Sequence, residues 1–87
     1  MTILSMLKID LGITTTAYDE RLTAVIKAAK ALIRREGAFL DDNSPEDMQL
    51  IIMTASWLWR RRDTGEGMPR MIRYALNNRI FSEKMEG

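Results

Sequence analysis

The side chains that most often perform enzyme chemistry are missing from this sequence. Its 87 residues include neither histidine nor cysteine. Histidine is the commonest general base and metal ligand, and cysteine supplies nucleophiles, thiolate ligands and disulfides. The sequence therefore predicts no disulfide framework, no thiolate metal site and no histidine-based pH switch.

Carboxylates could still do chemistry, and they occur in adjacent pairs at Asp19-Glu20, Asp41-Asp42 and Glu46-Asp47. We interpret these pairs as turn residues and helix-cap charges. Their spacing differs from a calcium loop, which needs alternating oxygen ligands, a central glycine and a late glutamate. Gly65 and Gly67 resemble half of a phosphate-binding loop, but no Gly-Lys-Ser/Thr follows them. We therefore predict no catalytic, cofactor-binding or metal-binding residue, and we expect the protein not to be an enzyme.

Charge is nearly balanced overall but unevenly distributed. Thirteen basic and twelve acidic residues give a net charge of +1, which does not by itself predict nucleic-acid binding. The stretch from Glu36 to Asp47 holds five acids and no base, whereas Arg60 to Arg79 holds six arginines and two acids. No stretch approaches the roughly 20 apolar residues that span a membrane. We expect residues 1–87 to form one small soluble domain, made in the cytoplasm.

A central helix is predicted over Ser44 to Arg62. Ser44 can cap the free amides of the first turn, and Pro45 suits the first helical position. The apolar residues that follow cover nearly every side of the helix, so we expect it to be buried in the middle of the fold.

Two more helices are predicted before it. The first runs from Ile3 to Leu11 and ends at Gly12, because leucines recur there at spacings of three and four. The second begins after a cap at Thr16 and closes at Gly37, with a one-sided apolar stripe between them.

A fourth helix is predicted after a flexible, glycine-rich loop at Asp63 to Gly67. It starts at Pro69, turns Met71 toward the core and ends at Asn77-Asn78. The tail at about 79–87 is expected to be flexible. The predicted fold class is all-α, a small bundle of about four helices.

The last turns of the central helix suggest an interaction surface. Trp57 and Trp59 lie about 200° apart around a helix, so both cannot fill one core face. Arg60, Arg61 and Arg62 exceed what a C-terminal cap requires. Two accounts remain open: the arginines meet nucleic-acid phosphates, or they meet the acidic stretch of a neighbouring copy. The candidate interface residues are Trp57, Trp59, Arg60, Arg61, Arg62, Arg70, Arg73, Asp41, Asp42, Glu46 and Asp47.

Three segments together carry a family resemblance. LSMLKIDLGI (Leu4 to Ile13) resembles the leucine-rich first helix of the small head–tail connector proteins of tailed bacteriophages and prophages. DERLTAVIKAAKALI (Asp19 to Ile33) resembles the second helix of that family, and Ser44 to Arg62 resembles the third. The triple arginine and the tail from Asn77 depart from the family pattern.

The resemblance implies a structural subunit without enzyme activity or cofactor. Such subunits form a ring of about twelve copies in the virion, at the head–tail interface below the portal. The implied partners are further copies, the portal protein, tail-side connector proteins and the packaged DNA, which passes through without sequence-specific binding. The alternative is a small helical DNA-binding or regulatory protein that uses the Arg60 to Arg79 basic block.

Overall fold

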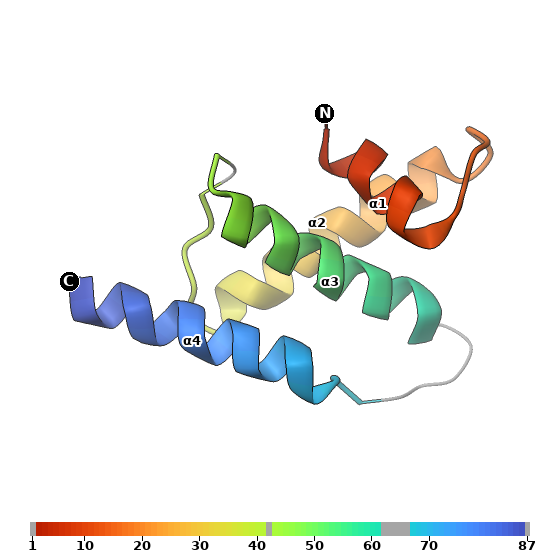
Figure 1. The fold of residues 1–87 in the computed structure, drawn as a ribbon. Helices are drawn as coiled ribbons and strands as arrows, with labels where there is room; N and C mark the ends of the chain where they lie inside the picture. Colours follow the sequence, from red (N-terminus) through yellow and green to blue (C-terminus); the bar gives the residue numbers. More distant parts are fainter. Residues whose placement is uncertain (1, 42, 62–66, 87) are drawn as a thin grey trace.

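The computed structural model describes residues 2–41, 43–61 and 67–86, the last five of them by backbone alone. Within these ranges the secondary structure is four α-helices and no strand, which confirms the all-α prediction. Figure 1 shows α3 (Pro45–Arg61) in the middle of the molecule, and α3 packs against each of the other three helices. The prediction of a central third helix is therefore confirmed.

The first helix, α1 (Ile3–Leu11), has both ends where the sequence places them. The Thr2 hydroxyl accepts the Ser5 backbone N–H at 3.1 Å, which caps the N-terminus. Gly12 closes the helix in the left-handed conformation, with φ of 72°, and its N–H donates to the Ile9 carbonyl. Leu7, fully buried, fixes α1 to the core.

The second helix, α2 (Asp19–Arg35), begins later than a cap at Thr16 would allow, so that prediction is wrong. Thr16 forms a turn in which its carbonyl accepts the Asp19 N–H at 3.2 Å. The Tyr18 ring packs edge-on against Trp59, with 5.8 Å between ring centroids, and this contact sets where the chain becomes helical. Asp19 bonds Lys8 of α1 across 2.8 Å instead of supporting a cap.

The central helix starts as predicted, because the Asp47 N–H points at the Ser44 hydroxyl at 3.4 Å. Its buried residues lie on several sides of the helix, which is why α3 can pack against three neighbouring helices. They are Asp47, Leu50, Ile51, Ile52, Thr54, Ala55 and Ser56.

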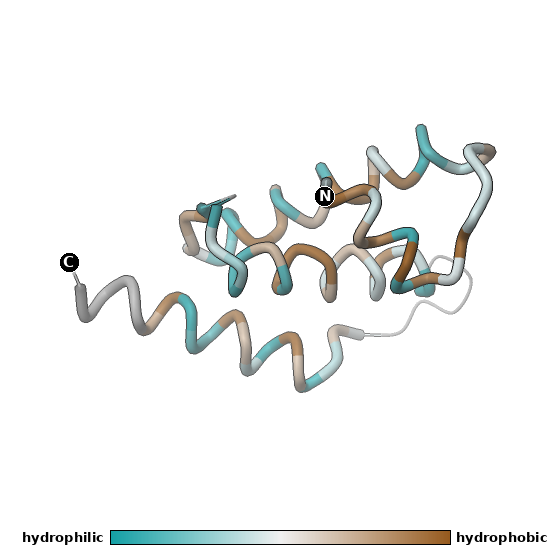
Figure 2. Tube along the Cα trace, turned by 45° about the horizontal axis from the view of Figure 1, so that its top comes forward, coloured by the Kyte–Doolittle hydropathy of each residue, from teal (hydrophilic) through white to brown (hydrophobic). Residues whose placement is uncertain are grey.

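The fourth helix, α4 (Arg70–Glu86), continues past Asn77-Asn78, so the predicted helix end is wrong. Relative to alanine, each asparagine destabilises a helix by only some tenths of a kcal/mol, roughly 0.7 at most. Tertiary contacts of the residues that follow Asn78 outweigh this cost. Ile72 and Leu76 are buried against α3, but Met71 is 73% exposed rather than facing inward. Figure 2 shows hydrophilic and hydrophobic residues alternating along α2 and α4, as expected of helices with one buried side. Most of the flexible loop predicted over Asp63 to Gly67, residues 63–66, lies outside the described residues.

Candidate interaction surfaces

An ion pair whose carboxylate is buried and whose arginine is 24% exposed joins the start of α3 to the middle of α4. Arg79 donates from Nε to Asp47 Oδ1 at 2.7 Å and from Nη2 to Asp47 Oδ2 at 3.3 Å. Asp47 is only 1% exposed, and its carboxylate also accepts the Asp41 backbone N–H at 2.8 Å. A second donation from Arg79 Nη2 reaches the Phe39 carbonyl at 2.8 Å. Arg79 therefore ties the loop before α3, the first turn of α3 and the C-terminal half of α4 together.

This pair corrects the predicted interface, because Asp47 was expected to meet a neighbouring copy. A carboxylate that is buried and bound to an arginine of its own chain has no free face for a partner. The sequence did indicate that Asp47 is buried. Asp47 precedes the buried Leu50, Ile51 and Thr54 by three, four and seven residues, and this spacing places it on the core face of α3.

A second ion pair links the end of α2 to α4. Arg73 Nη1 lies 3.4 Å from Glu36 Oε2, and both side chains are about two-fifths exposed, at 43% and 38%. An exposed pair of this kind contributes little to stability. Its significance is that Glu36 and Arg73 come from the acidic and basic stretches of the sequence. Part of the charge complementarity expected between two copies is thus used within one chain.

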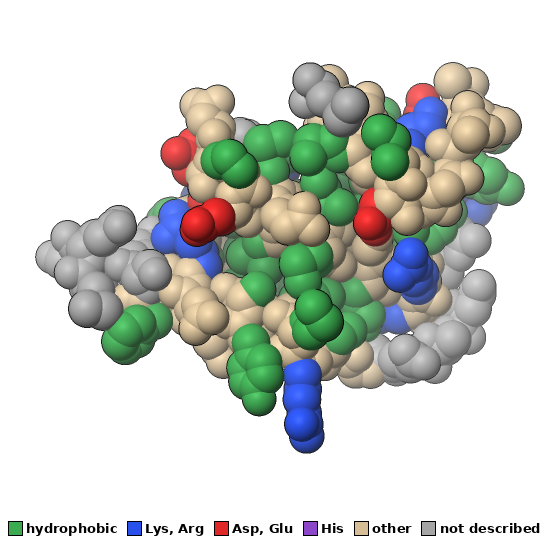
Figure 3. All heavy atoms as spheres, viewed as in Figure 1, with side chains coloured by type: hydrophobic (Ala, Val, Ile, Leu, Met, Phe, Trp, Pro, Cys, Tyr) green, Lys and Arg blue, Asp and Glu red, His purple; other side chains and the backbone are tan. Residues whose placement is uncertain are grey.

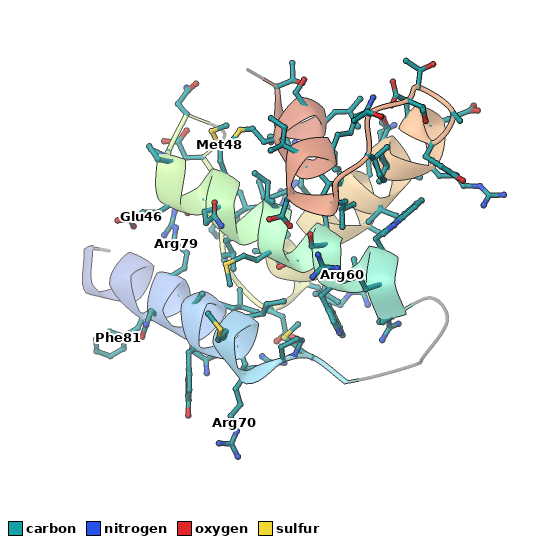
Figure 4. All side chains as sticks on the ribbon, turned by 45° about the vertical axis from the view of Figure 1, so that its right-hand side comes forward. Glu46, Met48, Arg60, Arg70, Arg79 and Phe81 are labelled. Carbon is teal, nitrogen blue, oxygen red and sulfur yellow. The ribbon has the colours of Figure 1, made fainter. Side chains whose placement is uncertain are left out.

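The remaining charges of the two stretches lie at opposite ends of α3. Asp41 and Glu46 are exposed near its N-terminus, whereas Arg60 and Arg61 are exposed at its C-terminus. Arg70, also exposed, is the first residue of α4 and points away from Arg60 in Figure 4. Glu46 and Arg60 are separated by about 21 Å along the helix axis. Figure 4 shows these two residues at the two ends of α3. Asp42 and Arg62, also predicted to belong to the interface, lie outside the described residues.

The two tryptophans diverge as their spacing predicts. Trp59 packs against the core and meets Tyr18 of the loop before α2. Trp57 points the other way, donates from Nε1 to the Gly67 carbonyl at 3.1 Å and stacks under the Arg61 guanidinium at 5.0 Å. It borders a hollow of about 340 Å³ whose apolar lining includes Met53 and Met71. This end of the molecule therefore combines exposed arginines with apolar surface.

Sequence reasoning missed an apolar stripe on the outer side of α4. Met71, Tyr74 and Phe81 are 73%, 62% and 65% exposed. At 100° per residue they fall within an arc of about 80°, away from the buried Ile72 and Leu76. The space-filling view shows hydrophobic side chains projecting along the edge formed by α4 (Figure 3), and Phe81 points away from the body in Figure 4.

The described part of the chain has few of the features that a catalytic or metal-binding site needs. No group of three or more acidic side chains there could hold a metal ion. A hollow of about 430 Å³ is open and lies between the start of α3 and α4, with Glu46 and the Asp47–Arg79 pair in its wall. None of the described helices is both long and apolar enough to cross a membrane.

Comparison with known proteins gives no relative from which a function could be transferred. No family model, no curated protein and no solved structure matches the chain. The functional argument therefore rests on the residues of this chain.

Proposed function

We propose that this chain is a structural subunit of a phage head–tail connector. About twelve copies form a closed ring below the portal, extend the DNA channel and allow the tail to attach. The partners are further copies, the portal protein and tail-side connector proteins, and packaged DNA passes through without sequence-specific recognition. The subunit acts at the head–tail interface of the virion after assembly in the host cytoplasm.

The observation that carries this proposal is the exposed apolar stripe of α4, Met71, Tyr74 and Phe81. Single exposed apolar residues are common, but three aligned large side chains along one helix resemble an interface. Tyrosine is also enriched among the residues that contribute most to protein–protein binding. The stripe extends from the end of α3 that exposes Arg60 toward the end that exposes Glu46.

The separation of charge suits a head-to-tail contact between copies. Asp41 and Glu46 lie at one end of α3, Arg60 and Arg61 lie at the other, and Arg70 begins α4. A contact between two different patches repeats from copy to copy and closes into a ring if the rotation allows it. The three segments that resemble the connector family fall on α1, α2 and α3, in that order.

Self-association of the full chain tests the proposal by sedimentation equilibrium. We expect the chain to associate as its concentration rises, and we expect Tyr74→Ser with Phe81→Ser to weaken association at least tenfold. The matched control is Ile9→Ser, which removes a similarly exposed side chain (68%) from α1 and leaves the stripe intact. A strict monomer at millimolar concentration would overturn the proposal. Equal loss of association in the control would overturn the role of α4.

The charged ends supply a second test. Glu46→Arg and Arg70→Glu each place like charges at the proposed contact, so each variant alone should associate less than the original chain. Mixing the two variants should restore association between unlike copies. If the mixture stays as weak as the separate variants, the head-to-tail arrangement is wrong. The genes that flank the coding sequence check the biological setting, because a connector gene is expected beside portal, capsid and tail genes.

A further inference from the structure

The solvent-facing side of α2 carries a concentration of positive charge that the overall composition conceals. Residues 21–35 include five basic residues and no acidic one, whereas the whole chain has a net charge of only +1. The rest of the chain therefore carries a net charge of −4. The five bases are Arg21, Lys27, Lys30, Arg34 and Arg35, and all except the half-buried Lys30 are exposed.

Helix geometry gathers these charges on one side of α2. Lys27 and Arg34 are seven residues apart, so they lie almost on one line along the helix, and Arg35 lies about a quarter-turn away on the same outer side. The exposed Glu20, seven residues before Lys27, falls on that line too, so the positive surface begins only at Arg21. The helix is about 25 Å long, enough to follow several phosphates of a nucleic-acid strand. α2 lies behind α3 in the view of Figure 1, so its outer side is turned away from the face drawn in Figure 3.

The neutral residues between the bases are small. Exposed Ala24, Ala28 and Ala31 separate the basic side chains on the outer side of α2, so a partner backbone can approach the helix closely. At the C-terminal end, a hollow of about 350 Å³ is lined by Lys30, Arg34, Phe39 and Leu40. Two of its four lining residues are basic, which suits an anionic group.

The arginines of the Arg60 to Arg79 stretch, which the sequence suggested for nucleic-acid binding, form a less continuous positive surface than α2 does. Arg73 pairs with Glu36, Arg79 with Asp47, and Arg61 lies over Trp57. The described arginines from Arg60 to Arg79 are thus divided among the end of α3, the first turn of α4 and the middle of α4. The outer side of α2 is the more continuous positive surface.

The chemistry of α2 also indicates the class of partner. All its residues are described, and none of its exposed positions holds a large apolar side chain, although the exposed Phe39 lies in the hollow beside its C-terminal end. A membrane-surface helix needs such residues to bury among the lipids, and a protein interface usually contains aromatic or large aliphatic anchors. Contacts with phosphates need only basic side chains and close approach.

We infer that the outer side of α2 binds the phosphate backbone of duplex DNA, without reading sequence. This inference goes beyond the proposed function and does not depend on ring formation. Contacts of this kind weaken steeply with salt and let a protein slide along DNA, so they are compatible with a subunit that DNA must pass.

Fluorescence anisotropy of the full chain with a labelled mixed-sequence duplex tests the inference at two salt concentrations. With about four phosphate contacts, affinity should fall about 150-fold between about 25 mM and about 100 mM salt. Lys27→Gln with Arg34→Gln removes two contacts, so the fall should shrink to about 12-fold. Duplexes of unrelated sequence should bind equally.

The matched control is Gln49→Glu with Asn77→Glu. It changes the net charge by the same −2 at exposed positions of α3 and α4, and it should retain the original salt dependence. Equal losses in the control and the α2 variant would overturn the inference, because net charge alone would then explain binding. Absence of duplex binding at about 25 mM salt would also overturn it, as would tighter binding to anionic vesicles than to DNA. A monomer that binds DNA as described would support this inference while contradicting the ring.

Discussion

Replacing Arg79 with alanine tests the contact that holds α4 to the rest of the fold. The change removes two hydrogen bonds to the Asp47 carboxylate and one to the Phe39 carbonyl. Asp47, which is 1% exposed in the intact chain, loses its arginine partner, and the Asp41 N–H is its remaining described donor outside α3. Removing one partner of a buried ion pair typically costs about 3–5 kcal/mol.

That cost is large for a domain of this size. A chain of 87 residues is expected to have a free energy of unfolding of about 4–13 kcal/mol. Arg79→Ala should therefore remove about a quarter or more of the stability. Urea unfolding followed by far-ultraviolet circular dichroism measures the loss. Arg79→Lys keeps the charge without the paired geometry and should fall between the original chain and the alanine variant.

The control is Arg60→Ala, which removes an exposed arginine from the end of α3 and should change stability by no more than about 0.5 kcal/mol. A loss below about 1 kcal/mol for Arg79→Ala would refute the reasoning. It would mean that Asp47 becomes hydrated at little cost, and that the C-terminal half of α4 is not held in place by this pair.

Two further predictions concern helix ends, and both are measured by thermal or urea unfolding. Gly12→Ala should cost about 1–2 kcal/mol, because alanine is strained at a φ of 72° although a Cβ there meets nothing within 4 Å. An unchanged stability would show that Gly12 does not hold this conformation. Ser44→Ala should cost about 0.5–1 kcal/mol through loss of the α3 cap, and Ser44→Asn should recover most of it. Equal stability of both Ser44 variants would contradict the capping role.

Local signals were sufficient for much of the fold. Gly12 marks the end of α1 because a left-handed residue is needed there, and few other residues adopt that conformation at low cost. Ser44 and Pro45 mark the start of α3 because each suits its own position in the first turn. The apolar run that follows predicted the central place of α3, since a helix that is apolar on several sides needs neighbours on several sides.

The errors arose where a contact between distant residues decided the outcome. Asn77-Asn78 reads as a helix end, but Arg79 binds Asp47 and Phe39 from the next turn and keeps the chain helical. Thr16 was predicted to cap α2 from local preference, whereas the contact between Tyr18 and Trp59 places the helix start later. These partners lie more than 30 residues apart, beyond the reach of any local pattern.

Contacts between distant residues also decided where several of the charges assigned to the interface lie. A block of acids and a block of arginines suggested that one copy meets another, yet Asp47–Arg79 and Glu36–Arg73 pair within one chain. The apolar stripe of α4 was obscured because Met71 was assigned to the core by its helical spacing. Which side of an amphipathic helix is buried depends on its neighbours, and α4 covers only one side of α3.

Electron microscopy of the purified full chain at high concentration tests the central proposal most directly. The proposed function predicts closed rings of one size with an open centre, which disappear when Tyr74 and Phe81 are both replaced by serine. The same chain seen only as monomers, or as open filaments without closure, would contradict a connector ring.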